Sequence, residues 1–129
     1  MNVVDSSGWL EYLADGPNAD FFAPAIRDTD HLLVPTICLY EVFKFLSLRL
    51  GEEAALEAVG VLHSGRVVDV TAEVALYAAQ LSIQHRLPMA DSLILAVARL
   101  NRATLWTQDE HFRGLEGVRY IPKQAASSG

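Results

Sequence analysis

Short apolar runs alternate with longer stretches of helical period along nearly all of the 129 residues. The central runs are apolar throughout, which is typical of parallel strands covered on both faces. Helical stretches between such strands indicate βαβ units and a doubly wound sheet. An α/β fold is therefore expected. Its candidate strands cover residues 2–4, 32–34, 67–70, 104–106 and 118–121.

Capping and stop residues delimit the helices expected between these strands. Ser6 or Ser7 is expected to cap a first helix, which the sequence Asp15-Gly16-Pro17 ends. The segment 17–30 stays open, because Pro24 interrupts its helical pattern. Further helices are expected over residues 35–50, 52–63, 71–85 and 89–101.

The length fits one domain, expected over residues 1–122, followed by a frayed tail over residues 123–129. Hydrophobic residues make up 51% of the chain, enough for a core at this size. No apolar run is long enough to span a bilayer, and the start has no basic segment of a signal peptide. Cys38 is the only cysteine, expected buried and inert. These features favour a cytoplasmic protein.

Four carboxylates are expected to meet at one edge of the sheet. Asp5 directly follows the first strand, and Asp109 stands three residues beyond Trp106 in the fourth. Open parallel sheets bind ligands beyond the carboxyl ends of their strands, near the point where strand order reverses. Glu41 and Asp91 lie in the first two turns of helices that open onto the same edge.

Carboxylates that converge without Lys or Arg beside each one repel one another, and a divalent cation removes that repulsion. The all-oxygen ligand set suits Mg²⁺ or Mn²⁺ and argues against Zn²⁺. Such a site supports phosphodiester hydrolysis. Each aspartate also has a purely structural alternative. Asp91 could serve to complement the dipole of its helix and do nothing more, and Asp5 could serve as a helix cap. Glu41 lies among apolar neighbours, where an unpaired charge is costly.

Four segments around these residues resemble PIN-domain proteins, and within that group the VapC-type toxins of bacterial and archaeal toxin–antitoxin pairs. The resemblance runs from Asn2 to Ile121, almost the whole chain. Each motif alone is weak, but four in order with matching spacing are strong together. The segments are 3–7, 34–42, 87–96 and 105–112.

The resemblance implies a three-layer α/β/α sandwich around a parallel sheet of four to five strands. It also implies an endoribonuclease that depends on Mg²⁺ or Mn²⁺, a homodimer, and a cognate antitoxin that inhibits the site. Its acidic positions fall on Asp5, Glu41, Asp91 and Asp109, with Thr107 as their hydroxyl neighbour. None of these acidic residues is missing, so nothing suggests an inactive enzyme.

Three other functions fit parts of the sequence. Histidines could support metal-free acid–base cleavage of RNA, but of the four only His111 lies near the proposed site. A surface position without a direct role is the alternative for His111. A phosphoacceptor signalling domain would need an acidic pair after the first strand, where Asp5 stands alone, and an aspartate after the third, such as Asp69. A vestigial module would bind antitoxin or RNA without cutting.

Charge is unevenly distributed along the chain. The net charge of −6 is unusual for a protein that binds nucleic acid. Residues 1–60 carry ten acidic side chains against three basic, whereas residues 80–129 carry six basic against four acidic. RNA is therefore expected to bind over the C-terminal half, with Arg113 as the basic residue nearest the site. Alternatively, the uneven charge reflects only two solvated faces of different composition. Lys44, one turn from Glu41, is expected to contact a phosphate or to pair with Glu41.

The helix expected over residues 35–50 has an apolar arc of about 160°, wider than one core-facing stripe needs. We expect part of it to contact a second chain in a homodimer. Deep burial within the monomer is the alternative. The arc consists of Cys38, Leu39, Val42, Phe43, Phe45, Leu46 and Leu50.

Overall fold

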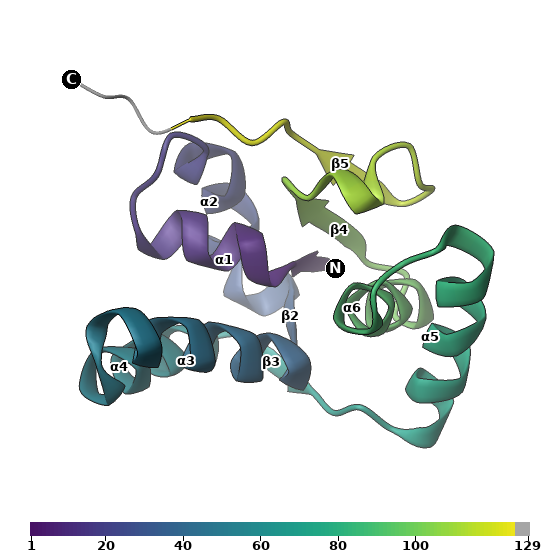
Figure 1. Ribbon diagram of the computed structural model, residues 1–129, viewed down its shortest axis with the longest axis horizontal. Coiled ribbons are helices and arrows are strands. Elements are labelled where there is room, and N and C mark those ends of the chain that lie inside the picture. Colours follow the sequence, from purple (N-terminus) through teal and green to yellow (C-terminus); the bar gives the residue numbers. More distant parts are fainter. Residues whose placement is uncertain (126–129) are drawn as a thin grey trace.

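A computed structural model describes residues 1–125 and confirms an α/β/α sandwich around a parallel sheet (Figure 1). The strand order is β3-β2-β1-β4-β5, and every neighbouring pair is parallel. The chain adds strands on one side of β1 and then on the other, so the order reverses between β1 and β4. The strands are β1 (Asn2–Val4), β2 (Leu32–Pro35), β3 (Arg66–Val68), β4 (Thr104–Thr107) and β5 (Val118–Tyr120).

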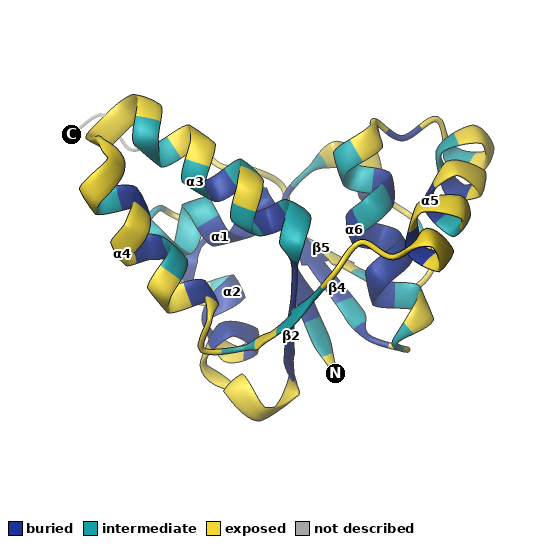
Figure 2. Ribbon diagram, turned by 90° about the horizontal axis from the view of Figure 1, so that it is seen from below, coloured by how far each residue is buried: buried dark blue, intermediate teal, exposed yellow. Residues whose placement is uncertain are grey.

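Six helices connect and cover the strands. Helices α1 and α2 lie on one side of the sheet, and α5 and α6 lie on the other (Figures 1 and 2). Helices α3 and α4 pack against each other, and α3 also contacts α1. The helices are α1 (Ser6–Leu13), α2 (Ala19–Arg27), α3 (Thr36–Leu50), α4 (Glu52–Leu62), α5 (Ala72–His85) and α6 (Met89–Leu100).

Burial follows the strand order. The residues of β2 are all buried, as are Val3 and Val4 of β1, whereas the edge strands β3 and β5 are partly exposed. The apolar character of the central strands is therefore explained by cover on both faces. The expected third strand was wrong at its end, because Asp69 and Val70 are exposed and lie beyond β3.

Helix α2 fills the segment that the sequence left open. Pro24 lies inside it but on its exposed side, and its missing N–H removes a single backbone donor. Phe22 and Ile26 are buried on the opposite side. The burial of these side chains stabilises the helix despite the proline.

Asp5, and not Ser6 or Ser7, caps α1. Its carboxylate accepts a hydrogen bond from the N–H of Gly8 at 2.8 Å. Gly8 permits a close approach of α1 to the core, because a Cβ there would lie 2.5 Å from the Phe22 ring and 2.7 Å from Val4. The cap and the missing side chain together fix the direction of α1 after β1.

No helix within residues 1–125 is long and apolar enough to cross a membrane. Most of the tail expected to fray lies outside the described residues. Its described part includes Gln124, whose side-chain amide donates to Asn18 Oδ1 at 2.9 Å.

Candidate metal centre

The ends of β1 and β4 lie side by side where the sheet order reverses. Val4 pairs with Trp106, and the N–H of Asp5 donates to the Trp106 carbonyl at 3.2 Å. Asp5 is the next residue after β1, and Thr107 is the last residue of β4. Open parallel sheets bind ligands at this position.

Asp5 is buried, with only 2% of its surface exposed. Besides the Gly8 N–H, its carboxylate accepts from the hydroxyls of Ser7 at 2.9 Å and Thr107 at 2.6 Å. Burial raises the pKa of Asp5 to about 7, although the three hydrogen bonds act in the opposite direction. The fold thus holds a carboxylate whose negative charge is poorly solvated.

Thr107 connects Asp5 with a second carboxylate. Its hydroxyl oxygen accepts from the Asp109 N–H at 2.9 Å while it donates to Asp5. The Asp109 side chain accepts from the His111 N–H at 2.9 Å and caps the 3₁₀ turn Glu110–Phe112. The loop after β4 is therefore held close to the loop after β1.

Asp91 stands in the first turn of α6, whose following residues are mostly buried. Burial raises its pKa to about 6, and the negative charge of Asp109 adds to the rise. His111 Nδ1 lies 2.9 Å from Asp91 Oδ2 and 3.0 Å from Asp109 Oδ1. Hydrogen bonding to Asp91 and the charge of Asp109 raise the pKa of His111 in turn.

Glu41 completes the cluster from α3. It accepts a hydrogen bond from the Ser6 hydroxyl at 2.6 Å, which ties the second turn of α3 to the start of α1. All four predicted carboxylates border one cleft of about 250 Å³. The residues that line it are Asp5, Ser6, Ser7, Leu10, Glu41, Phe45, Asp91, Ile94 and Asp109.

The donor set of this cleft fits a divalent cation. Within residues 1–125, the salt-bridge contacts of the four carboxylates come only from His111, and none from Lys or Arg. Carboxylate oxygens are the ligands that Mg²⁺ and Mn²⁺ prefer. Asp91, Asp109 and His111 each offer one ligand atom, and these three atoms lie within 4.8 Å of one another. A bound cation would offset the unfavourable charge that burial imposes on Asp5 and Asp91.

The two predicted basic contacts lie outside the cleft. Lys44 is exposed and its Nζ lies 3.5 Å from the hydroxyl of Tyr40. The salt bridges within residues 1–125 do not include the expected ion pair with Glu41. Arg113 is exposed as well. A neighbouring hollow of about 450 Å³ shares Ser7 and Asp109 with the cleft. Its lining is Ser7, Gln108, Asp109, Glu110, His111, Pro122 and Lys123.

Sequence reasoning missed the two serines and Lys123. The sequence predicts Ser6 or Ser7 only as a helix cap, and their contacts with Glu41 and Asp5 depend on the direction of α1. Lys123 reaches the site region through a segment with no regular structure. The position of His111, two residues after Asp109, was the one available signal for its bridging contact.

The phosphoacceptor alternative is wrong. The strand order of such domains places the third strand beside the first. Here β2 separates β3 from β1, so Asp69 after β3 is remote from Asp5.

Comparison with known proteins adds a family match. The sequence model of the PIN domain matches residues 3–118. No curated protein sequence matches the chain.

Solved structures share the fold at low sequence identity. A toxin–antitoxin complex from Klebsiella pneumoniae is 21% identical with a TM-score of 0.77, covering 92% of this chain and 96% of that chain. VapBC2 from Rickettsia felis, bound to a promoter DNA fragment, is 16% identical with a TM-score of 0.72, covering 94% and 97%. VapC20 from Mycobacterium tuberculosis, described as a sarcin-ricin loop cleaving toxin, is 21% identical with a TM-score of 0.67, covering 81% and 85%.

Proposed function

This chain belongs to the PIN domain family, and on that premise we propose that it is a metal-dependent endoribonuclease, the toxin of a VapBC-type pair. One observation carries the proposal: four carboxylates border a single cleft at the switch point of the sheet, and no Lys or Arg of residues 1–125 forms a salt bridge with them. The similar structures support it, since they include a toxin–antitoxin complex, a VapBC2 assembly and a sarcin-ricin loop cleaving toxin.

Asp5, Glu41, Asp91 and Asp109 would hold Mg²⁺ or Mn²⁺. The bound cation would activate water and stabilise the leaving oxygen of the phosphodiester. The protein's own part is to fix these ligands. Thr107 orients Asp5 through a 2.6 Å hydrogen bond, and Ser6 orients Glu41 through another of the same length.

The RNA backbone would approach over the C-terminal half. Lys123 lines the hollow next to the cleft, and Arg113 follows the 3₁₀ turn that carries His111. Lys44, on α3, would contact a phosphate from the other side. None of these cations lines the carboxylate cleft itself, so they would bind phosphates other than the scissile one.

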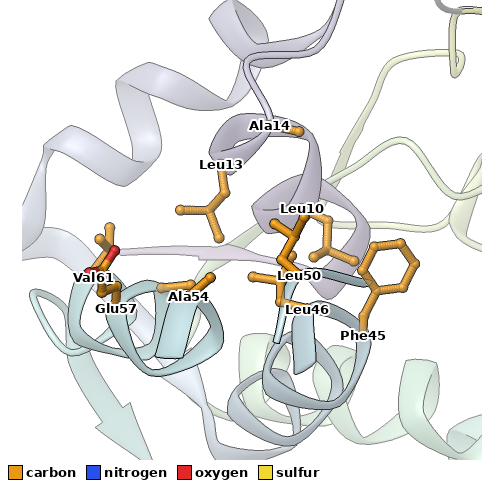
Figure 3. Close-up of a pocket in the computed structure, with 10 residues that line it drawn as sticks. Leu10, Leu13, Ala14, Phe45, Leu46, Leu50, Ala54, Glu57 and Val61 are labelled. Carbon is orange, nitrogen blue, oxygen red and sulfur yellow. The ribbon is translucent and has the colours of Figure 1, made fainter. Parts of the chain in front are cut away.

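An apolar groove next to the cleft is the proposed antitoxin site. The groove, of about 310 Å³, lies between α1 and the paired helices α3 and α4 (Figure 3). Leu10 and Phe45 line both the groove and the carboxylate cleft, so a segment seated in the groove would end at the cleft. The groove is lined by Leu10, Leu13, Ala14, Phe45, Leu46, Leu50, Ala54, Glu57, Ala58 and Val61.

The charge around the groove suggests the character of the antitoxin segment. A neighbouring hollow shares Leu13 and Val61 with the groove, and its charged side chains are Asp15 and Asp20 against one basic residue, Arg27. An apolar helix or strand with basic residues at the end that reaches this hollow would complement both features.

The proposed homodimer uses the other side of α3. Only Cys38 and Val42 are fully buried in this helix, so the alternative of deep burial within the monomer is wrong. Part of the apolar arc, including Phe45 and Leu46, faces the groove. Leu48 is 79% exposed and lies outside the groove, where a second copy of the chain would cover it.

Incubation of antitoxin-free protein with total cellular RNA tests the proposed activity. We expect cleavage with Mg²⁺ or Mn²⁺, none in chelator, and none by Asp91→Asn, while the matched surface variant Asp69→Asn cleaves like the wild type. Undiminished cleavage in chelator would revive the histidine mechanism. Absence of cleavage under every condition would favour the binding module instead.

A further inference from the structure

His111 occupies an unusual position between two of the proposed ligands. Its Nδ1 atom lies at 2.9 Å and 3.0 Å from one oxygen each of Asp91 and Asp109. The side chain is 55% exposed, so solvent and ions reach it freely. Its backbone N–H also fixes the Asp109 carboxylate at 2.9 Å. The residue is thus held at the site by both its main chain and its ring.

We propose that His111 Nδ1 is itself a ligand of the divalent cation, so that the centre is a mixed carboxylate–imidazole site. This inference rests on the proposed metal centre and narrows its chemistry. Ligands on adjacent positions of an octahedral cation, each about 2.1 Å from it, lie roughly 3 Å apart. Both distances from His111 Nδ1 have that length. Ligation through Nδ1 requires that this atom carry no proton, so the ring N–H of the bound form is on Nε2.

A purely electrostatic role for His111 explains less of the site. A protonated His111 would neutralise one of the two carboxylates that it contacts, and Asp5 and Glu41 would still border the same cleft without a Lys or Arg contact within residues 1–125. The cluster would still need a cation. If His111 remained protonated beside that cation, the two positive charges would repel each other.

The nitrogen ligand has a consequence for metal choice. Mg²⁺ strongly prefers oxygen ligands and retains its waters, whereas transition metals accept imidazole readily. Of the two ions expected here, Mn²⁺ accepts an imidazole nitrogen more readily, so the proposed ligation predicts a preference for Mn²⁺ over Mg²⁺. Replacing His111 should therefore lower the affinity for Mn²⁺ more than the affinity for Mg²⁺.

Titration of the purified full chain with Mn²⁺ alone and Mg²⁺ alone tests the assignment. His111→Ala should weaken Mn²⁺ binding about tenfold or more and change Mg²⁺ binding much less. His31→Ala is a matched control, since His31 Nδ1 contacts Asp28 at 2.9 Å on the surface, and it should change neither affinity. Pulsed electron paramagnetic resonance of bound Mn²⁺ should show nitrogen coupling in the wild type and none in His111→Ala.

Two outcomes would overturn the assignment. Unchanged or tighter binding of both ions by His111→Ala would show that the imidazole is a competing cation, and a wild-type spectrum without nitrogen coupling would show all-oxygen ligation. The variant Asp91→Asn distinguishes failure of the His111 assignment from failure of the proposed function. If it abolishes binding of both ions, the metal centre stands and only the role of His111 is at issue. If the wild type binds neither ion, both proposals fail.

Discussion

Asp5 has two roles that oppose each other. As the cap of α1 its carboxylate helps to fold the chain, yet its burial makes the negative charge unfavourable. The pKa of about 7 lies above the ordinary value of 3.8, so folding favours the protonated form. In the metal-free protein, Asp5 therefore lowers the free energy of unfolding progressively as pH rises from about 4 to about 7. Above about pH 7 this destabilisation is complete.

Asp5→Asn should be more stable than the wild type in chelator at pH 8, on the order of 2 kcal/mol. Asn caps a helix as well as Asp does and carries no charge. The difference should shrink as pH falls toward 5, where Asp5 is protonated in the fold. Urea unfolding at several pH values measures it, with the exposed Asp69→Asn as control. A difference that stays constant with pH would show that Asp5 is not a strained charge.

The carboxylates were easier to predict than their hydrogen-bond partners. Asp5 and Asp109 follow directly from their places at strand ends, because the pattern of β-type runs fixes where a parallel sheet ends. The contact of Ser6 with Glu41 depends on how α1 and α3 cross. The contact of His111 with Asp91 joins a loop to a helix twenty residues away. Such contacts require coordinates, since no local pattern encodes them.

At the scale of elements, the close packing of α1 depends on Gly8. Gly8→Ala should destabilise the protein by about 1–3 kcal/mol, because the new Cβ would overlap the Phe22 ring. Helix propensity alone predicts the opposite sign, a gain of up to about 1 kcal/mol. Gly60→Ala is the matched control, since Gly60 is exposed in α4 and a Cβ there meets nothing within 4 Å. Chemical denaturation of both variants measures the contrast; a stable Gly8→Ala protein would contradict the packing.

Two leucines near the end of α3 separate the proposed interfaces. Leu50 is 69% exposed and lines the groove, whereas Leu48 lies outside it. Leu50→Glu should weaken binding of the cognate antitoxin and leave the dimer intact, and Leu48→Glu should do the reverse. Copurification and analytical sedimentation give the two readouts. A wild-type protein that is monomeric at high micromolar concentration would count against the dimer, and tight antitoxin binding by Leu50→Glu would count against the groove.

The elements themselves were largely predictable, since turn and cap residues delimit five of the six helices. Helix α2 was the exception, because the sequence signal of Pro24 conflicts with the burial of Phe22 and Ile26. Burial is a tertiary property, and it outweighed the local signal. The apolar arc of α3 borders the groove with Phe45, Leu46 and Leu50, and this placement depends on where α1 packs.

For the whole molecule, uneven charge should decide how RNA approaches. The variants are made in an Asp91→Asn background, so that RNA binding is measured without cleavage. Arg113→Ala and Lys123→Ala should each weaken RNA binding. Each should also lower the slope of the logarithm of affinity against the logarithm of salt concentration by about 1, the value for one phosphate contact. Arg27→Ala in the acidic half is the control. Binding measured across a salt series gives both quantities. If only Arg27→Ala alters the affinity, the proposed orientation is wrong.

The products of cleavage test the central claim most directly, namely that the carboxylate cluster hydrolyses RNA with a bound cation. A labelled RNA that the protein cuts is treated in Mn²⁺ or in chelator, and the new ends are analysed. The account predicts cutting in Mn²⁺ alone, by attack of water, so that no end carries a 2′,3′-cyclic phosphate. Cutting in chelator that leaves cyclic phosphates would contradict it, because the RNA's own 2′-hydroxyl would then be the nucleophile under acid–base catalysis.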